Sequence, residues 1–204
     1  KIAKLALQIE QEKLKESVGS QDQITAAFGG FNLIEFNKLS DFNVQNIMSE
    51  KKINILNNSS ILLFSGIRRL SARIEKRKID KIHSGKIKKC LNNINNITKN
   101  ALSEFTKKEM DLKKIGKLMN LYWEQKKDLT KGVSNSEIDN ICKIALKNGA
   151  YGVKLLGSGG GGFVYILCPS NIKKKLCKKL SKFKIVYFAF ENSGSTIVYN
   201  KTLF

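Results

Sequence analysis

Three stretches of the chain place apolar residues every three or four positions among polar ones, which predicts amphipathic helices. These stretches are residues 1–16, residues 86–129 and the segment after Ser134. Ser134 and Glu137 have the spacing of a capping box, and Gly149 is placed to end that last helix. The stripes consist of Ile2, Leu5, Ala6, Ile9 and Leu14, then Ile87, Leu91, Ile94, Ala101 and Phe105, then Leu112, Ile115, Met119 and Tyr122, and then Ile138, Ile141, Cys142 and Ala145.

Short apolar runs bounded by turn residues predict strands between and after these helices. Pro169 ends one run, and Ser170 is placed to cap a following helix that carries Leu176 and Leu180. Helices interleaved with mostly antiparallel strands indicate an α+β sandwich with a split β-α-β element. The runs are residues 31–36, 53–56, 61–64, 153–156, 163–168, 184–190 and 196–199, the last two joined by a turn at residues 192–194.

The charge of the chain is unusual, although its overall composition is that of a globular protein. Among 204 residues, 37 Lys and Arg stand against 17 Asp and Glu, a net charge of +20. Such an excess suits anionic partners such as nucleic acid, anionic lipid or a phosphorylated small molecule. Arginine occurs only at Arg68, Arg69, Arg73 and Arg77, however, and bidentate phosphate recognition favours arginine. We therefore interpret most of the charge as a solvated lysine surface.

The cysteines and the apolar runs indicate the compartment. Cys90, Cys142, Cys168 and Cys177 are scattered without zinc-ligand spacing, which is typical of a reduced protein. No apolar run is long enough to span a bilayer. We therefore expect a cytoplasmic protein without a structural metal site. The chain opens on Lys1, inside an expected helix, so we also expect a further segment upstream.

A run of small residues between two expected strands is the strongest single feature of the sequence. It satisfies the letters of the dinucleotide fingerprint and of the kinase glycine-rich loop, but a strand is expected after it rather than a helix, and no H-R-D or D-F-G motif follows. The Walker pattern fails because Phe163 and Val164 follow the last glycine. Two interpretations of this run are possible. It is either a hairpin loop without a ligand or a loop whose backbone approaches phosphate. The run is Gly157, Ser158, Gly159, Gly160, Gly161 and Gly162.

One carboxylate near the start of the chain stands between two amides. Gln21, Asp22 and Gln23 are followed by Gly29 and Gly30. A carboxylate in this setting can accept a proton from a substrate hydroxyl, and neighbouring amides can hold sugar hydroxyls. Alternatively, Asp22 caps a helix through residues 24–27, and taken alone this is the simpler reading.

The two features together resemble the GHMP kinase superfamily. The segment at residues 21–32, QDQITAAFGGFN, and the segment at residues 154–163, KLLGSGGGGF, stand in family order. Residues 62–69, 123–127 and 133–135 add to the likeness, which covers nearly the whole chain and is strongest to sugar kinases of the heptose 7-phosphate type. The resemblance implies the end of an N-terminal kinase domain at residues 1–58. It also implies a C-terminal domain at residues 59–204, an α/β sandwich with an antiparallel, ferredoxin-like sheet.

The resemblance also implies roles for individual residues. Asp22 matches the catalytic aspartate, and residues 157–162 match the motif near the nucleotide phosphates. Arg69 matches a basic position that contacts substrate or phosphate, and Lys154 matches the lysine before the glycine loop. ATP, Mg²⁺ and a sugar or sugar phosphate are the implied cofactors and substrates. Substrate contacts are implied for Gln21, Gln23, Gly29 and Gly30.

The chain departs from the family pattern at its start. The family's first motif, its proline- and glycine-rich ATP loop and the acidic magnesium ligand after that loop have no counterpart in residues 1–204. We therefore expect that this chain alone phosphorylates nothing, as a fragment, a split kinase or a degenerate relative. An upstream segment or a partner subunit would supply the missing half, and a homodimer is a further possible assembly. The alternative is a non-enzymatic basic α+β module for nucleic acid or an acidic partner, against which sparse arginine argues.

Overall fold

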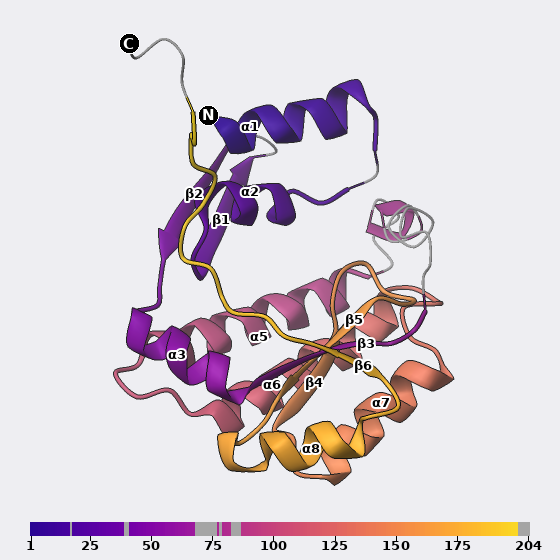
Figure 1. The fold of residues 1–204 in the computed structure, drawn as a ribbon. Helices are drawn as coiled ribbons and strands as arrows, with labels where there is room; N and C mark the ends of the chain where they lie inside the picture. The colour runs from indigo at the N-terminus through magenta and orange to yellow at the C-terminus, as the bar shows by residue number, and fades with distance from the viewer. Residues whose placement is uncertain (17, 39–40, 68–76, 78, 83–86, 200–204) are drawn as a thin grey trace. The chain divides into compact units, whose positions relative to one another are not determined.

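The computed structural model describes residues 1–16, 18–38, 41–67, 77, 79–82 and 87–199. The chain forms two compact units, which are described here one at a time (Figure 1). The first unit combines residues 1–49 with the segment that starts at Ala189, and the second runs from Glu50 to Phe188. The predicted division of the chain after residue 58 stays a prediction.

The first unit consists of helices and one two-stranded sheet. Helix α1 (Ile2–Leu7) continues as a π-helix (Gln8–Lys13), and α2 (Gln21–Phe28) follows. Strands β1 (Asn32–Lys38) and β2 (Asp41–Asn46) pair antiparallel, with Ile34 opposite Val44. The helix predicted over residues 1–16 and the strand predicted over residues 31–36 are confirmed, whereas β2 was not predicted. The small core consists of Ala3, Leu7 and Ile24, with Ala27, Ile34, Phe42 and Val44 packed against it.

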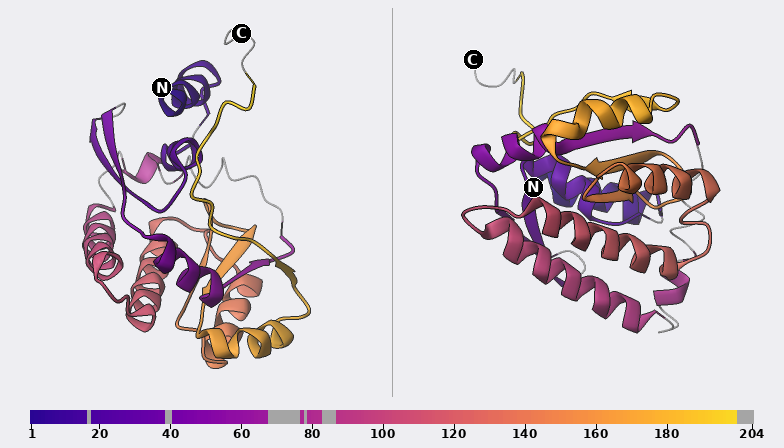
Figure 2. Two further views of the ribbon diagram at one scale, coloured as in Figure 1. Left: turned by 60° about the vertical axis from the view of Figure 1, so that its left-hand side comes forward. Right: turned by 90° about the horizontal axis from the view of Figure 1, so that it is seen from below.

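The second unit contains a four-stranded antiparallel sheet in the order β4-β5-β3-β6. Its strands are β3 (Ser60–Phe64), β4 (Gly152–Leu155), β5 (Phe163–Leu167) and β6 (Lys184–Val186). Strand β5 lies between β3 and β4, so the helical connection from β3 to β4 makes a split β-α-β element. The second half, β5-α8-β6, completes the ferredoxin-like order, and the predicted α+β class is confirmed (Figure 2).

Several helices accompany this sheet in the described part of the unit. The core forms where apolar residues of the strands meet α7 and α8, because alternate strand residues share one face. Trp123 of α6 joins this core and is 3% exposed. The helices are α3 (Glu50–Ser59), α5 (Lys88–Thr106), α6 (Leu112–Leu129), α7 (Ser136–Lys147), a 3₁₀ turn (Ser170–Ile172) and α8 (Lys173–Lys179). Buried core residues include Ile61, Leu63, Ile138, Ile141, Ala145, Val153, Leu155, Val164, Ile166, Leu176 and Leu180.

The strand predicted at residues 53–56 is wrong, because this run lies inside α3. Ile53 and Leu56 are buried and stand three residues apart, which puts them on the same side of a helix. A four-residue apolar run fits a buried strand and a helix equally well when it is short.

The strands predicted near the C-terminus are only partly correct. Of residues 184–190, only Lys184–Val186 pair with β3, and residues 196–199 have no regular secondary structure. Tyr187, Ile197, Val198 and Tyr199 are between 74% and 98% exposed. These two segments are rich in residues that favour strands. A strand forms, however, only where a neighbouring strand supplies hydrogen bonds.

The cap of α7 lies one residue further along the chain than predicted. The side-chain oxygen of Asn135 accepts from the Ile138 amide at 3.1 Å, and Ser134 donates to Asp139 at 2.7 Å. The predicted capping box is therefore wrong in its residues. The predicted end of the helix is confirmed, since Gly149 has a φ of +95° there.

Helix α6 lies unusually close to β4 because a glycine stands on each side. A Cβ atom built on Gly116 would lie 2.5 Å from the carbonyl carbon of Tyr151, and one on Gly152 would collide with the Gly116 backbone. Asn120 joins the same two elements, since its side chain donates to the Tyr151 carbonyl at 3.1 Å and accepts from the Val153 amide at 2.9 Å. The backbone of the helix thus packs directly on the backbone of the strand.

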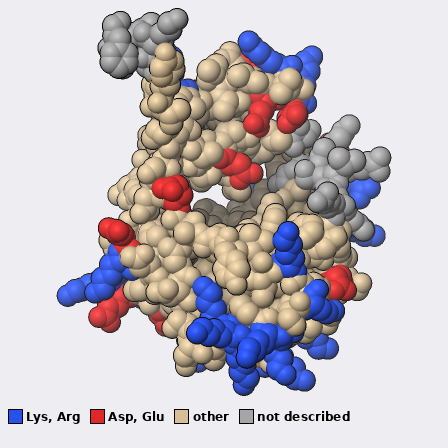
Figure 3. Space-filling view, viewed as in Figure 1, with Lys and Arg blue, Asp and Glu red and all other residues tan. Residues whose placement is uncertain are grey.

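Lysine side chains crowd the surface of α8 (Figure 3). Leu176 and Leu180 are buried beneath the helix, whereas its lysines at residues 174, 175, 178 and 179 are exposed. This separation of apolar and charged sides is what a solvated amphipathic helix requires. It agrees with the interpretation of the charge as a lysine surface.

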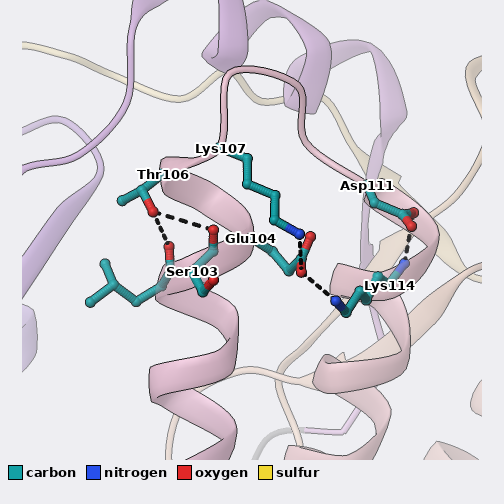
Figure 4. Close-up of polar contacts among 7 residues, drawn as sticks. Ser103, Glu104, Thr106, Lys107, Asp111 and Lys114 are labelled. Atoms are coloured by element: carbon teal, nitrogen blue, oxygen red, sulfur yellow. Dashed lines mark hydrogen bonds and ion pairs between the residues drawn. The ribbon is translucent and has the colours of Figure 1, made fainter.

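A buried carboxylate fastens the turn between α5 and α6 (Figure 4). Glu104 is 2% exposed, and its Oε1 lies 2.7 Å from Lys107 Nζ and 2.6 Å from Lys114 Nζ. Asp111 caps α6 by accepting from the Lys114 amide at 3.0 Å. Hydrogen bonds from Lys107 and Lys114 lower the pKa of the Glu104 carboxyl below its usual 4.5.

Replacing Glu104 by glutamine is expected to lower the melting temperature at neutral pH and to reduce its dependence on acid. Because the folded pKa lies below 4.5, the stabilisation is complete above that pH and is lost as the pH falls through the folded pKa. Thermal unfolding followed from about pH 7 to about pH 3 measures this. Glu109→Gln, at an exposed position in the same turn, is the control. An unchanged acid slope in Glu104→Gln would contradict the assignment.

Candidate functional site

The glycine-rich run at residues 157–162 forms the turn of the β4–β5 hairpin. The Leu156 amide donates to the Phe163 carbonyl at 2.8 Å and closes the hairpin. A strand follows the loop, as predicted, so the dinucleotide fingerprint is excluded by its context. Four of the glycines adopt positive φ angles: Gly157 at +68°, Gly159 at +116°, Gly160 at +78° and Gly162 at +98°. Side chains at these positions would strain the backbone.

The middle of this loop is bound to the segment before α7. The Gly160 amide donates to the Val133 carbonyl at 2.8 Å, and the Asn135 side chain donates to the Gly160 carbonyl at 3.2 Å. A Cβ on Gly159 would lie 2.9 Å from Val133 Cα. Asn135 therefore caps α7 with its oxygen and holds the loop with its nitrogen.

The end of the loop is bound to the segment after β3. The Gly162 amide donates to the Ile67 carbonyl at 2.9 Å, and its own carbonyl accepts from the Ser65 amide at 2.9 Å. A Cβ on Gly161 would lie 2.6 Å from the Ile67 carbonyl oxygen. The glycines thus allow neighbouring backbone to approach closely, and the loop has a fixed shape.

The start of the loop is held by a lysine that the sequence analysis did not single out. Lys126, in the last turn of α6, is 9% exposed, and its ammonium group donates to the Gly157 carbonyl. The residue stood in a stretch that supported the family resemblance. One lysine among many gave no further signal in the sequence.

Lys154, predicted from its place before the loop, packs against α6. It lies on β4 opposite Tyr165, and its Nζ stands 4.4 Å from the centre of the Tyr122 ring. Burial lowers the pKa of its ammonium group. This is the cation–π arrangement of a stem packed on the sheet, and a phosphate contact for Lys154 stays a prediction.

Asp22 lies in the first turn of α2, in the other unit, and its side chain is exposed. Ser20 occupies the N-cap position, so Asp22 is inside the helix and does not cap it. Ile24, fully buried in the core of that unit, fixes the helix in place. The carboxylate is therefore available to a ligand on a helix that is held in position.

The amides beside Asp22 differ in their surroundings. Gln21 is exposed, whereas Gln23 is partly buried and donates through its side-chain nitrogen to the Glu10 carboxylate. Gln23 therefore joins α2 to the helical segment at the start of the chain. A substrate contact for either amide stays a prediction.

Gly29 and Gly30 accommodate the segment near the C-terminus. A Cβ on Gly29 would collide with the backbone of Ser193, and the Gly30 amide donates to the Glu191 carbonyl at 2.9 Å. The Ser195 amide donates to the Ala27 carbonyl at 3.1 Å nearby. This close packing explains why residues without side chains stand at both positions. The predicted substrate contact of the two glycines stays a prediction.

Comparison with known proteins places these elements in a family. The family model described as "GHMP kinases C terminal" matches residues 101–184. D-glycero-alpha-D-manno-heptose 7-phosphate kinase of Campylobacter jejuni is 33% identical over 201 residues, which are 95% of this chain and 57% of that protein. The chain carries the C-terminal domain of the GHMP kinase family. The resemblance drawn from the sequence is confirmed.

Solved structures agree with this GHMP kinase assignment. A putative sugar kinase from Campylobacter jejuni is 30% identical with a TM-score of 0.61, covering 94% of this chain and 55% of its own. The mevalonate kinase of Methanococcus jannaschii is 28% identical with a TM-score of 0.66, covering 91% and 54%. The chain thus spans between 54% and 57% of the length of these three relatives. These likenesses give no support to a basic nucleic-acid-binding module.

Two further features that the resemblance implies are the basic residue Arg69 and a magnesium ion. Arg69 lies outside the described residues. Within the described part of the chain, no three His, Cys, Asp or Glu side chains gather as a metal site would require. Among the described helices, none is long and apolar enough to cross a membrane.

A pocket of about 550 Å³ opens between α6, α7 and β4, and none of the predicted site residues lines it. Trp123, Lys127 and Cys142 line it. Burial raises the pKa of the Cys142 thiol to about 11, so the thiol stays protonated at neutral pH.

Proposed function

We propose that the protein transfers a phosphoryl group from ATP to a hydroxyl of a sugar or sugar phosphate, with a heptose 7-phosphate as the first candidate. The observation that carries this proposal is the likeness to a heptose 7-phosphate kinase over 95% of the chain. That likeness takes in both the helix of Asp22 and the glycine-rich loop.

The described residues suit the chemistry of phosphoryl transfer. This reaction depends on positioning and electrostatic stabilisation more than on covalent help from the protein. The oxygen of the acceptor hydroxyl would bond to the γ-phosphorus of ATP while the bond between that phosphorus and ADP breaks. The exposed carboxylate of Asp22 would accept the proton of this hydroxyl. The Gly160 and Gly162 amides fix the loop by bonding within the protein, and the Ser158 amide would donate to the phosphates.

A turnover assay tests the proposal with three acceptors: a heptose 7-phosphate, galactose and mevalonate. We expect ADP release with the heptose phosphate to exceed that with the other two. Preference for mevalonate would contradict the sugar assignment. Because the family's ATP loop is not among residues 1–204, we expect no turnover from these residues alone. The assay therefore compares them with the same chain extended by the coding sequence that precedes Lys1.

A further inference from the structure

Lys126, the buried lysine of α6, holds the glycine-rich loop through a hydrogen bond. Lys126 places an ammonium group against the Gly157 carbonyl at the start of the glycine-rich loop. Burying a charged group is costly unless it is well hydrogen-bonded, so this contact is a strong constraint on the loop. The other described ties of the loop, at Val133, Asn135, Ser65 and Ile67, join uncharged groups.

The contact also fixes the direction of the next amide. The described chain has no cis peptide bonds, so the Gly157 C=O and the Ser158 N–H point to opposite sides of one planar unit. With the carbonyl held on the ammonium group, the Ser158 N–H faces away from Lys126. The bound cation also polarises this peptide and makes its N–H a better donor.

We propose that Lys126 is the positioning residue of the glycine-rich loop: it orients the Gly157–Ser158 peptide so that the Ser158 amide donates to a phosphate oxygen. This inference rests on the proposed function. It gives the loop-holding role to Lys126 and not to Lys154, whose ammonium group stands on the Tyr122 ring.

The test is the binding of inorganic tripolyphosphate to the 204-residue chain by calorimetry, together with the amide spectrum of the ¹⁵N-labelled protein. Lys126→Met removes the charge, and Lys126→Arg keeps a donor. Lys127→Met is the matched control, because the neighbouring Lys127 pairs with Glu124 at 2.8 Å. We expect Lys126→Met to bind about 10-fold more weakly, the effect of losing a charge-assisted hydrogen bond. Lys126→Arg should stay within about threefold of the parent chain, and Lys127→Met within about twofold.

The spectrum separates a positioning role from a merely structural one. In the parent chain, tripolyphosphate should shift the Ser158 amide, and in Lys126→Met this shift should be lost. If Lys126→Met does not fold, the Ser158 shift in the parent chain and in Lys126→Arg decides. Binding without a Ser158 shift, or equal binding by Lys126→Met, overturns the inference alone. Absence of any binding overturns the phosphate role of the loop and with it this part of the proposed function.

Discussion

Replacing Gly116 by alanine is expected to destabilise the second unit by about 2 kcal/mol or more, in opposition to helix propensity. Alanine favours a helix interior over glycine by about 1 kcal/mol, so propensity alone predicts a more stable protein. The new Cβ would lie 2.5 Å from both the carbonyl carbon and the Cβ of Tyr151. Backbone cannot yield as a flexible side chain can, so α6 or β4 has to move and the Asn120 bonds to β4 are lost.

Urea unfolding of Gly116→Ala measures this effect. Gly152→Ala changes the same contact from the side of the strand, because its new Cβ would collide with the Gly116 backbone. We expect this variant to be destabilised too. Lys117→Ala, at the exposed neighbouring position of α6, should change the free energy of unfolding by no more than about 0.5 kcal/mol. A Gly116→Ala protein that is more stable than the parent would show that the helix and strand do not pack this closely.

Replacing Asp22 by asparagine is expected to lower kcat by about 10²- to 10⁴-fold, the usual contribution of a general base. Asparagine has the same shape and cannot take the proton of the acceptor hydroxyl. The cost to stability should be small, because an exposed charge in the first turn of a helix contributes at most about 1 kcal/mol through the helix dipole. Steady-state kinetics with a heptose 7-phosphate, in the extended chain, measures the loss.

The outcome distinguishes catalysis from a local structural role. Glu35→Gln removes another exposed carboxylate of the same unit and should leave kcat unchanged. If Asp22→Asn turns over at the parental rate, the carboxylate does not serve as the base. A large fall in melting temperature with an unchanged rate would show instead that Asp22 mainly stabilises α2.

The sequence predicted the parts of the fold that repeat a clear pattern. Residues 88–106, 112–129 and 136–147 are helices because each carries a long apolar stripe, and length makes such a stripe unambiguous. The hairpin of β4 and β5 followed from two apolar runs around glycines. The antiparallel order, in contrast, depends on pairings between residues about a hundred positions apart, such as Leu63 with Val164.

The site was harder to predict than the fold. Asp22 and the loop were found because each has a distinctive local sequence. Lys126 was missed because its partner, Gly157, is 31 residues away and lysine is common in this chain. The packing of Gly29 against the backbone near Ser193 was not predicted, because it has no signature in the neighbouring sequence.

The pairing of Gly30 with Glu191 and of Ala27 with Ser195 has a consequence during protein synthesis. The ribosome makes residues 1–49 before residues 50–188 and residues 189–199 after them, yet the first and the last of these segments belong to one unit. Residues 50–188 hold the whole of the second unit, so this unit can fold before the two parts of the first unit pair. A released chain that ends before Ala189 should therefore have residues 50–188 that resist protease and residues 1–49 that do not.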